Sequence, residues 1–141
     1  MQNHWQIYAV GSAFFAGLTA ILAKVGVVAI SSNMATFIRT LVVCFFLGLW
    51  LAARAQWVNP FTLSSKSLIF LILSGLTTGL SWLLYFRALQ LGDASLVVSI
   101  DKLSLPFAVI LAVIFLGEHL GARQWLGVAF MIIGSLLAAF K

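Results

Sequence analysis

Five long apolar stretches run along this chain of 141 residues, and short polar breaks separate them. The pattern predicts five helices, over Trp5–Ala23, Met34–Ala53, Ser67–Phe86, Ala94–Leu116 and Ala122–Phe140. Each stretch has about the 20 mostly apolar residues that an α-helix needs to cross the hydrocarbon core of a bilayer. The chain is therefore predicted to be an all-α integral membrane protein with a single transmembrane domain over residues 1–141.

The breaks between the stretches carry residues that favour helix ends and turns. The first contains Gly26 and the Ser31–Asn33 segment, the second Asn59–Pro60, and the third Gly92 followed by Asp93. The fourth begins with Gly-Glu-His and ends with a glycine. Glycine commonly ends a helix, whereas Ser, Asn and Asp cap the start of one. Loops this short are too small to hold a catalytic domain.

The composition indicates what surrounds these helices. Hydrophobic residues make up 63% of the chain, charged residues only 8%, and the mean hydropathy is +1.15. A soluble domain carries roughly 25% charged residues, and a chain this short cannot hide the difference in a core, so its outer surface must face lipid. The net charge of +5 comes from basic residues spread over the segment ends. That distribution is typical of lipid-headgroup anchoring and not of a nucleic-acid partner.

The tryptophans, the single cysteine and the N-terminal segment fit the same interpretation. Cys44 lies inside an apolar stretch, so we expect a small packing residue and no intramolecular disulfide. The first stretch has no Lys or Arg before it and others follow it, so it is expected to be an uncleaved helix and not a signal peptide. An aromatic belt is indicated near the predicted interfaces by Trp5, Trp50, Trp57 and Trp125.

An odd number of crossings puts the two termini on opposite sides of the membrane. The loops on the N-terminal side carry Arg54, Lys66 and Arg123, and those on the other side carry Lys24, Arg87 and Lys141. This balance gives almost no positive-inside signal, and counting Arg39 and Lys102 with the second side makes only a modest bias. A dual-topology, antiparallel dimer is therefore one hypothesis, and a single fixed orientation is the alternative.

Three ionisable residues lie inside predicted spans: Arg39 in the second, and Asp101 and Lys102 in the fourth. Such residues are expensive in a membrane and often functional. Both helices enter from the same side, so Arg39 and Asp101 lie at depths of about 8 and 11 Å, close enough to pair. Tyr85 and Arg87 reach the same side. One interpretation is a structural tie, with Lys102 reaching the headgroups; the other is an aqueous cavity with Asp101 as a proton or cation site.

Pro106 adds a backbone feature beside this charged pair. Proline has no N–H, so the carbonyl four residues earlier, at Lys102, is expected to lose its helical partner and to be free. A kinked helix with an unsatisfied carbonyl is typical of transporter sites. The sequence therefore predicts a helix kink at Pro106.

Polar and small residues also recur at helical spacing. Ser74, Thr78, Ser81 and Tyr85 share one face of the third helix. This stripe is either interhelical hydrogen-bonding glue or the lining of a pathway. Close helix packing is predicted at three small-residue pairs, Ala13 with Gly17, Gly75 with Gly79, and Gly134 with Ala138.

Other kinds of chemistry have no sequence support. His4 and His119 are isolated near predicted interfaces, and no Cys/His cluster has metal-ligand spacing. The sequence has no glycine-rich phosphate loop and no Ser/His/Asp arrangement beyond chance. We therefore expect no enzyme activity, no cofactor and no metal site.

Five segments of the chain are distinctive, and they are residues 81–94 (SWLLYFRALQLGDA), 100–104 (IDKLS), 115–118 (FLGE), 18–24 (LTAILAK) and 35–40 (ATFIRT). Together they resemble the EamA domain, which is the repeat unit of the drug/metabolite transporter superfamily. The resemblance covers nearly the whole chain, and it is greatest to the small bacterial and archaeal proteins that hold a single such domain.

The resemblance implies an incomplete transporter. The family's usual members have ten helices, as two five-helix repeats of inverted orientation around a central cavity, so this chain corresponds to one half. It must then pair, with an inverted copy of itself or with a homologous subunit. Small multidrug resistance proteins also form antiparallel dimers, but they have four helices and an embedded Glu in the first, which this chain lacks. Asp101 and Lys102 also depart from many ten-helix members, which are apolar there.

Together these features predict a dimeric carrier of a small metabolite that works by alternating access in the cytoplasmic (inner) membrane of a prokaryote. Asp101 is expected to be the coupling or gating acid and Arg39 its partner. The remaining residues predicted to line the substrate or ion pathway are Lys102, Tyr85, Arg87, Ser81 and Thr78. The alternative is a non-transporting membrane protein that serves as a small structural or accessory subunit of a larger complex.

Overall fold

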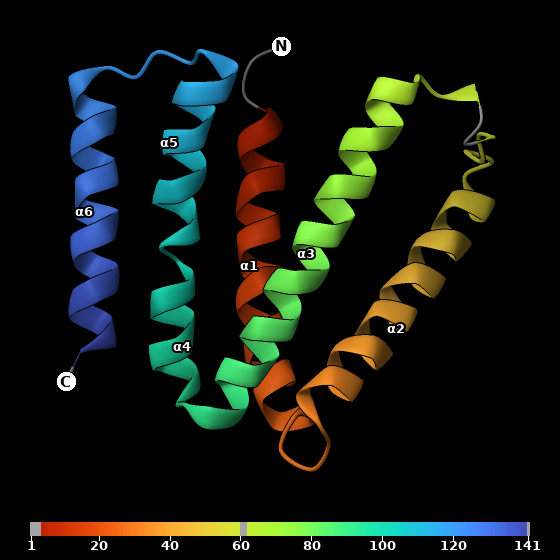
Figure 1. Ribbon diagram of the computed structural model, residues 1–141, viewed down its shortest axis with the longest axis horizontal. Coiled ribbons are helices and arrows are strands. Elements are labelled where there is room, and N and C mark those ends of the chain that lie inside the picture. Colours follow the sequence, from red (N-terminus) through yellow and green to blue (C-terminus); the bar gives the residue numbers. More distant parts are fainter. Residues whose placement is uncertain (1–3, 60–61, 141) are drawn as a thin grey trace. The chain divides into compact units, whose positions relative to one another are not determined.

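The computed structural model describes residues 4–59 and 62–140, and its regular secondary structure is helical. The helices are α1 (His4–Gly26), α2 (Ser32–Ala53), α3 (Ser65–Leu91), α4 (Ala94–Asp101), α5 (Ser104–Leu116) and α6 (Ala122–Ala139) (Figure 1). No strand occurs in these two described ranges. Pro60, of the turn expected at Asn59–Pro60, lies outside the described residues.

Five helical segments are long and apolar enough to cross a membrane. They are Trp5–Gly26, Ser32–Ala53, Ser65–Leu91, Ala94–Leu116 and Ala122–Ala139, and α4 and α5 together make the fourth. Their lengths of 18 to 27 residues correspond to about 27 to 40 Å at 1.5 Å per residue, which matches a bilayer core of about 30 Å. The predicted fold class, an all-α protein with five membrane-length helices, is confirmed.

Local side-chain and backbone chemistry sets several helix ends. Ser31 precedes α2 with extended backbone angles, and its hydroxyl oxygen accepts a hydrogen bond from the Met34 N–H at 3.3 Å, which satisfies one of the first free amides. Gly117 ends α5 in the left-handed conformation, with φ of 69°, a position that favours glycine. At the start of α6, the Gln124 side-chain oxygen accepts from the Gly121 N–H at 2.7 Å.

The chain divides into two compact units. The central unit, residues 23–90, holds the last turn of α1, all of α2 and nearly all of α3. The terminal unit, residues 1–22 and 91–141, holds the rest of α1 together with α4, α5 and α6. The placement of one unit relative to the other is not determined.

The terminal unit is organised around α6. After the turn at residues 117–121, α6 runs back beside α5 and then α4, and it contacts both (Figure 1). Few side chains are buried in the described part of this unit: Ala20 on α1, Pro106 on α5 and Val128 on α6. The unit is thus a thin layer of helices and has almost no core of its own.

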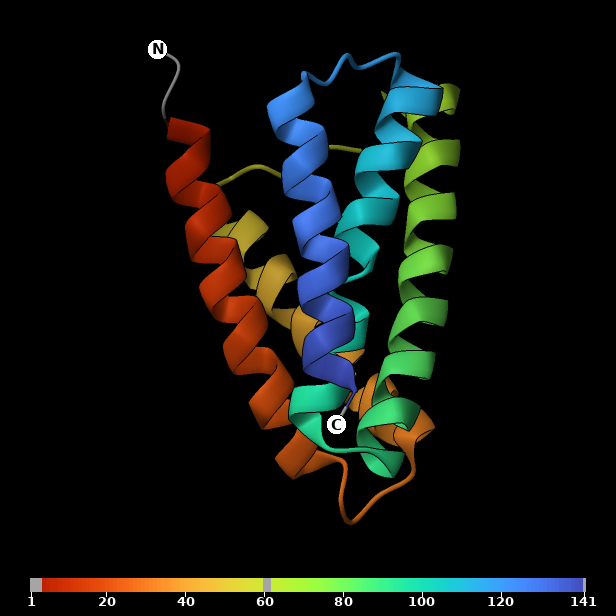
Figure 2. The same ribbon diagram turned by 90° about the vertical axis from the view of Figure 1, so that its left-hand side faces the viewer.

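The central unit is a helical hairpin that is closed at one end. α2 and α3 approach each other beside the turn at residues 27–31 and diverge toward the connection at residues 54–64 (Figures 1 and 2). The buried side chains gather at the closed end, and they are Val27, Ser32, Ala35, Thr36, Phe86 and Leu89. Most large apolar side chains elsewhere on the two helices are exposed, so they are available to lipid or to another chain.

Candidate functional site

Arg39, the charged residue inside the second span, is held against aromatic rings of α3. Its guanidinium carbon lies 4.2 Å from the centre of the Trp82 ring and 5.6 Å from that of Phe86. Because Trp82 and Phe86 are four residues apart, their rings share one face of the helix. A cation over an aromatic face is stabilised by about 0.5–2 kcal/mol, with the larger value where water is excluded. The rings therefore offset part of the cost of placing this charge in an apolar helix.

Tyr85, from the same turn of α3, is close enough to Arg39 for an electrostatic interaction. The structure thus brings together two of the predicted pathway residues. Within the described ranges the Arg39 guanidinium makes no hydrogen bond or ion pair, so the edges of this planar group keep their donors while its face rests on the rings.

The predicted partner of Arg39, Asp101, belongs to the terminal unit, where it is the last residue of α4. Its side chain is half-buried and that of the next residue, Lys102, is exposed. Neither side chain has a hydrogen-bond or ion-pair partner among the described residues. Because the two units are not placed relative to one another, the pairing of Arg39 with Asp101 stays a prediction.

The fourth span is interrupted immediately after Asp101. α4 ends there and α5 begins at Ser104, so Pro106 lies in the first turn of α5, where a missing N–H is readily tolerated. The expectation of a free carbonyl at Lys102 was wrong, because that oxygen accepts a hydrogen bond from the Leu105 N–H at 3.1 Å. A tighter turn, with a bond to the third residue along instead of the fourth, supplies the donor that proline cannot.

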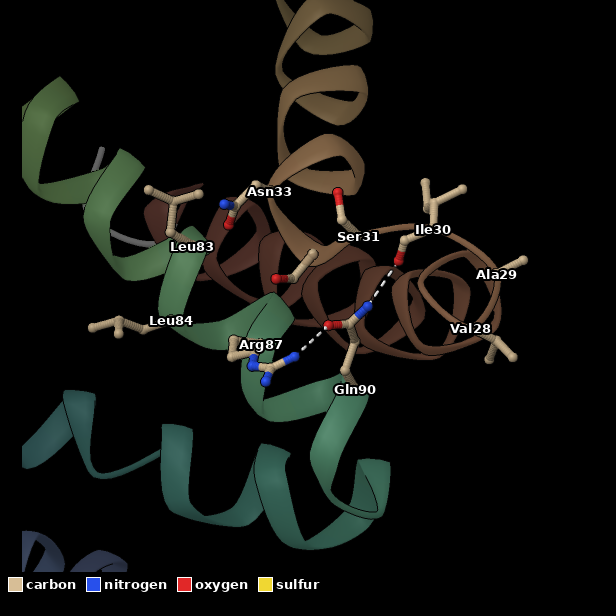
Figure 3. Close-up of a pocket in the computed structure, with 10 residues that line it drawn as sticks. Val28, Ala29, Ile30, Ser31, Asn33, Leu83, Leu84, Arg87 and Gln90 are labelled. Carbon is tan, nitrogen blue, oxygen red and sulfur yellow. Dashed lines mark hydrogen bonds between the residues drawn. The ribbon is translucent and has the colours of Figure 1, made fainter.

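A hollow of about 780 Å³ opens at the closed end of the central unit. Its walls are residues 28–33, from the turn and the start of α2, and Leu83, Leu84, Arg87 and Gln90 from α3 (Figure 3). Apolar side chains form much of the lining, and Arg87 is the one charged residue among the described residues that make it up. A concavity that combines apolar side chains with well-placed polar groups is a common form of a small-molecule site.

Gln90 joins the wall of this hollow to the turn. Its side-chain nitrogen donates to the Ile30 carbonyl at 2.7 Å and to the Val27 carbonyl at 3.3 Å. Its side-chain oxygen accepts from an Arg87 guanidinium nitrogen at 3.2 Å. One amide therefore fixes the turn to α3 and at the same time orients the Arg87 side chain, as Figure 3 shows.

Lys24 makes a second link at the same end of the central unit. Its ammonium group donates to the Leu89 carbonyl at 2.6 Å, one of the last carbonyls of α3, which have no partner within the helix. A cation is favoured at a helix C-terminus. The last turn of α1 is thus fixed to the end of α3.

Charge is distributed very unevenly along the chain. Residues 23–90 contain five basic residues and no acid, so they carry the whole net charge of +5. The five are Lys24, Arg39, Arg54, Lys66 and Arg87. Residues 91–141 contain all three acids, balanced by three basic residues. The central unit therefore has a positive field that no carboxylate of its own reduces.

The polar stripe of α3 is exposed over most of its length. Ser74, Thr78 and Ser81 are exposed, and Tyr85 is half-buried. The Thr78 hydroxyl donates to the Ser74 carbonyl of its own helix at 2.8 Å, which is a common way to satisfy a hydroxyl in a membrane helix. The stripe is thus accessible, and both of its interpretations, glue and pathway lining, stay predictions.

The small-residue positions show free space around them. A methyl group added at Gly17, Gly75 or Gly79 would meet no atom within 4 Å, and Ala13 on α1 is exposed. Close packing at these positions therefore stays a prediction. It would require a further helix to approach these small residues.

Two groups of contact residues escape prediction from the sequence. Trp82 and Phe86 have the character of ordinary apolar helix positions, although their spacing of four is a signal for an aromatic cradle. Gln90 and Lys24 bond to backbone carbonyls, and no sequence pattern specifies which carbonyls will be free. No group of three or more metal-binding side chains occurs among the described residues.

Five apolar helices of membrane length define a multi-pass integral membrane protein. The chain belongs to the EamA-like transporter family, whose sequence model matches residues 3–140. It is a membrane transporter by class, and the family points away from an enzyme. The resemblance stated from the sequence is confirmed.

Two known proteins are similar to this chain in sequence. The chain is 51% identical over 139 residues to a Sinorhizobium sp. protein described as an uncharacterized transporter in the cobO 3′ region, and the match covers 99% of each chain. It is 30% identical over 86 residues to an uncharacterized protein of Methanocaldococcus jannaschii, covering 61% of this chain and 63% of the relative. No solved structure matches this chain.

Proposed function

We propose that the protein is a carrier of a small metabolite that works as an antiparallel dimer by alternating access in the inner membrane of a prokaryote. The observation that carries this proposal is membership of a transporter family over nearly the whole chain, combined with the five membrane-length helices found in the described residues. The Sinorhizobium relative is matched over 99% of its length, so it too is a chain of this size. A two-chain unit would supply ten helices.

The near absence of a core also supports the pairing. Few side chains in the described ranges are buried, and large apolar residues are exposed on every membrane-length helix. Lipid can cover apolar side chains, but it cannot bond with the exposed hydroxyls of α3 or with the charged residues inside the spans. A second chain facing those groups would form a water-accessible pathway between two copies.

Within this carrier, Asp101 is the proposed coupling or gating acid and Arg39 its partner, with Lys102 and Tyr85 at the mouth. The lack of an ion-pair partner for Asp101 and Arg39 among the described residues supports this assignment. Both lie inside membrane-length helices, where an unpaired charge costs several kcal/mol and favours pairing with an opposite charge.

Replacing Asp101 by Asn tests the central claim, because it removes the charge and keeps the size. A thermal-shift screen of metabolites first identifies a solute that binds the protein. Transport of this solute is then measured by counterflow in proteoliposomes. We expect the Asp101→Asn protein to transport this solute at least about tenfold more slowly than the wild type, a barrier change of about 1.4 kcal/mol.

Asp93→Asn is the matched control. Asp93 is exposed beside the start of α4 and its carboxylate makes no capping hydrogen bond, so this variant should keep its flux. Full transport by an Asp101→Asn protein that elutes and melts like the wild type would refute the assigned role. A pure, folded protein that moves no solute but binds another membrane protein stoichiometrically would instead favour the accessory-subunit alternative.

A further inference from the structure

The hollow at the closed end of the central unit has the chemistry of an anion site. Arg87 lines it, is exposed, and uses one of its five N–H donors on Gln90. The other donors of this guanidinium have no hydrogen bond within the described residues. A planar cation with free donors, held in a set orientation, matches the two oxygens of a carboxylate or the oxygens of a phosphate.

Besides Arg87 and Gln90, three polar residues line the same hollow, and they are Ser31, Ser32 and Asn33 on the α2 side. The Asn33 amide has no hydrogen bond among the described residues. The Ser31 hydroxyl oxygen accepts from the Met34 N–H, so its own hydrogen is available to donate. Figure 3 shows Asn33 and Ser31 on the α2 side of the hollow and Arg87 on the α3 side. Polar side chains therefore lie on both walls, and the Ser31 hydroxyl is turned toward α2, where it accepts from the Met34 N–H.

The charges of the central unit favour an anion over a cation in the hollow. No acid occurs in residues 23–90, and Lys24, Arg39 and Arg87 belong to the same end of this unit. Among the charges of this unit a cation would meet only like charges, whereas an anion would be attracted. Half of the lining residues are apolar, among them Val28, Ile30 and Leu83, so the ligand should have an apolar part beside its charged end.

We propose that this hollow binds the oxyanion group of a small amphipathic molecule, with Arg87 as the main binding residue and Gln90 as the residue that positions it. The oxyanion is a carboxylate or a phosphate. It belongs either to a free organic anion, which would then be the transported solute and so rests on the proposed function, or to the headgroup of an anionic lipid.

Calorimetric titration of the purified protein in detergent tests the free-anion source. The probes are sodium phenylacetate and inorganic phosphate at constant ionic strength, with phenylacetamide as an uncharged analogue of the same shape. We expect phenylacetate to bind at least about tenfold more tightly than phenylacetamide, a difference of about 1.4 kcal/mol. Arg87→Gln should remove this preference. Arg87→Lys should keep part of it, because lysine retains the positive charge but lacks the paired N–H donors of the guanidinium.

Arg54→Gln is the matched control, since Arg54 is an exposed arginine of the same unit whose guanidinium lies 5.1 Å from the Trp50 ring centre instead of lining the hollow. It should bind the probes like the wild type. The lipid source is tested by native mass spectrometry of protein taken from nanodiscs of phosphatidylglycerol or phosphatidylcholine. The site would be assigned to lipid if two results are found together. The wild type and Arg54→Gln proteins retain phosphatidylglycerol while the Arg87→Gln protein loses it, and the wild type does not bind the soluble probes.

Equal behaviour of the Arg87→Gln and Arg54→Gln proteins in both measurements would overturn the proposal. Neither measurement needs flux, so the two proposals fail separately. A protein that transports a solute but binds no oxyanion through Arg87 contradicts only this inference. A protein that binds phenylacetate through Arg87 but moves no solute contradicts only the carrier function.

Discussion

Arg39 shows how single residues of this chain support a charge inside an apolar helix. The guanidinium lies over Trp82 and close to Phe86, so its face meets polarizable rings while its edges keep their donors. The arrangement differs from an ion pair, because it stabilises the cation without neutralising it. A positive charge thus persists at this depth for an anionic group or for Asp101 to meet.

A double-mutant cycle on Arg39 and Trp82 measures this contact. Arg39→Met, Trp82→Leu and the double variant are unfolded thermally or in denaturing detergent, and their free energies of unfolding are compared with the wild type. We expect a coupling energy of about 0.5–2 kcal/mol. The pair Arg39 and Trp57 is the control, since Trp57 lies in the connection after α2. Zero coupling for Arg39 with Trp82 would mean that the stacking contributes nothing.

At the scale of elements, the fourth span is the one that departs from a regular helix. It is interrupted at Lys102–Leu103, between α4 and α5, one turn before Pro106. Asp101 and Lys102 lie at this interruption, so these two charged residues are at the point where the backbone of the span is least regular. Interrupted helices at membrane depth are tolerated where they line a cavity or are covered by protein.

Pro106→Ala should make this span more regular. The new N–H at position 106 can donate to the Lys102 carbonyl and continue the helix across the interruption. We expect amide hydrogen exchange of residues 102–105 to slow by about tenfold, or about 1.4 kcal/mol, and transport to decrease. Leu105→Ala, which keeps the proline, is the control. Unchanged exchange in Pro106→Ala would show that proline does not cause the interruption.

At the scale of the whole molecule, five crossings by the five membrane-length helices would put the two termini on opposite sides of the membrane. A second copy joined directly to the end of the first must therefore insert upside down. A second copy joined through one additional transmembrane helix must insert the same way up. The two fusions differ in orientation and otherwise contain the same two domains.

These two fusions test the antiparallel dimer. We expect the direct fusion to transport at about the rate of the unfused protein, and the fusion with the extra helix to lose at least about tenfold in rate. Both must be expressed in the membrane at equal levels and elute as folded species. Equal or greater flux through the fusion with the extra helix would contradict the antiparallel arrangement.

The fold followed from the sequence more completely than the site did. The existence and number of membrane-length segments could be predicted because bilayer thickness fixes the length of an apolar segment, and caps such as Ser31 and Gly117 follow from local backbone chemistry. The aromatic partners of Arg39 depend on how α2 and α3 meet, which no local pattern specifies. The prediction for the Lys102 carbonyl was wrong because it considered only the hydrogen bond from the N–H of the fourth residue along, which proline lacks. In the structure the N–H of the third residue along, Leu105, donates to this carbonyl instead.

The amide of Gln90 has a further consequence for motion. Any movement of the turn at residues 27–31 away from α3 must break its bonds to the Ile30 and Val27 carbonyls. Each hydrogen bond contributes a net of about 0.5–1.5 kcal/mol, so breaking the two costs about 1–3 kcal/mol, and exposing the buried Val27 side chain adds to this cost. A cost of at least about 1 kcal/mol leaves the turn open in at most about one molecule in six. Such a minor population is large enough for a ligand to select and small enough for the closed turn to dominate in its absence.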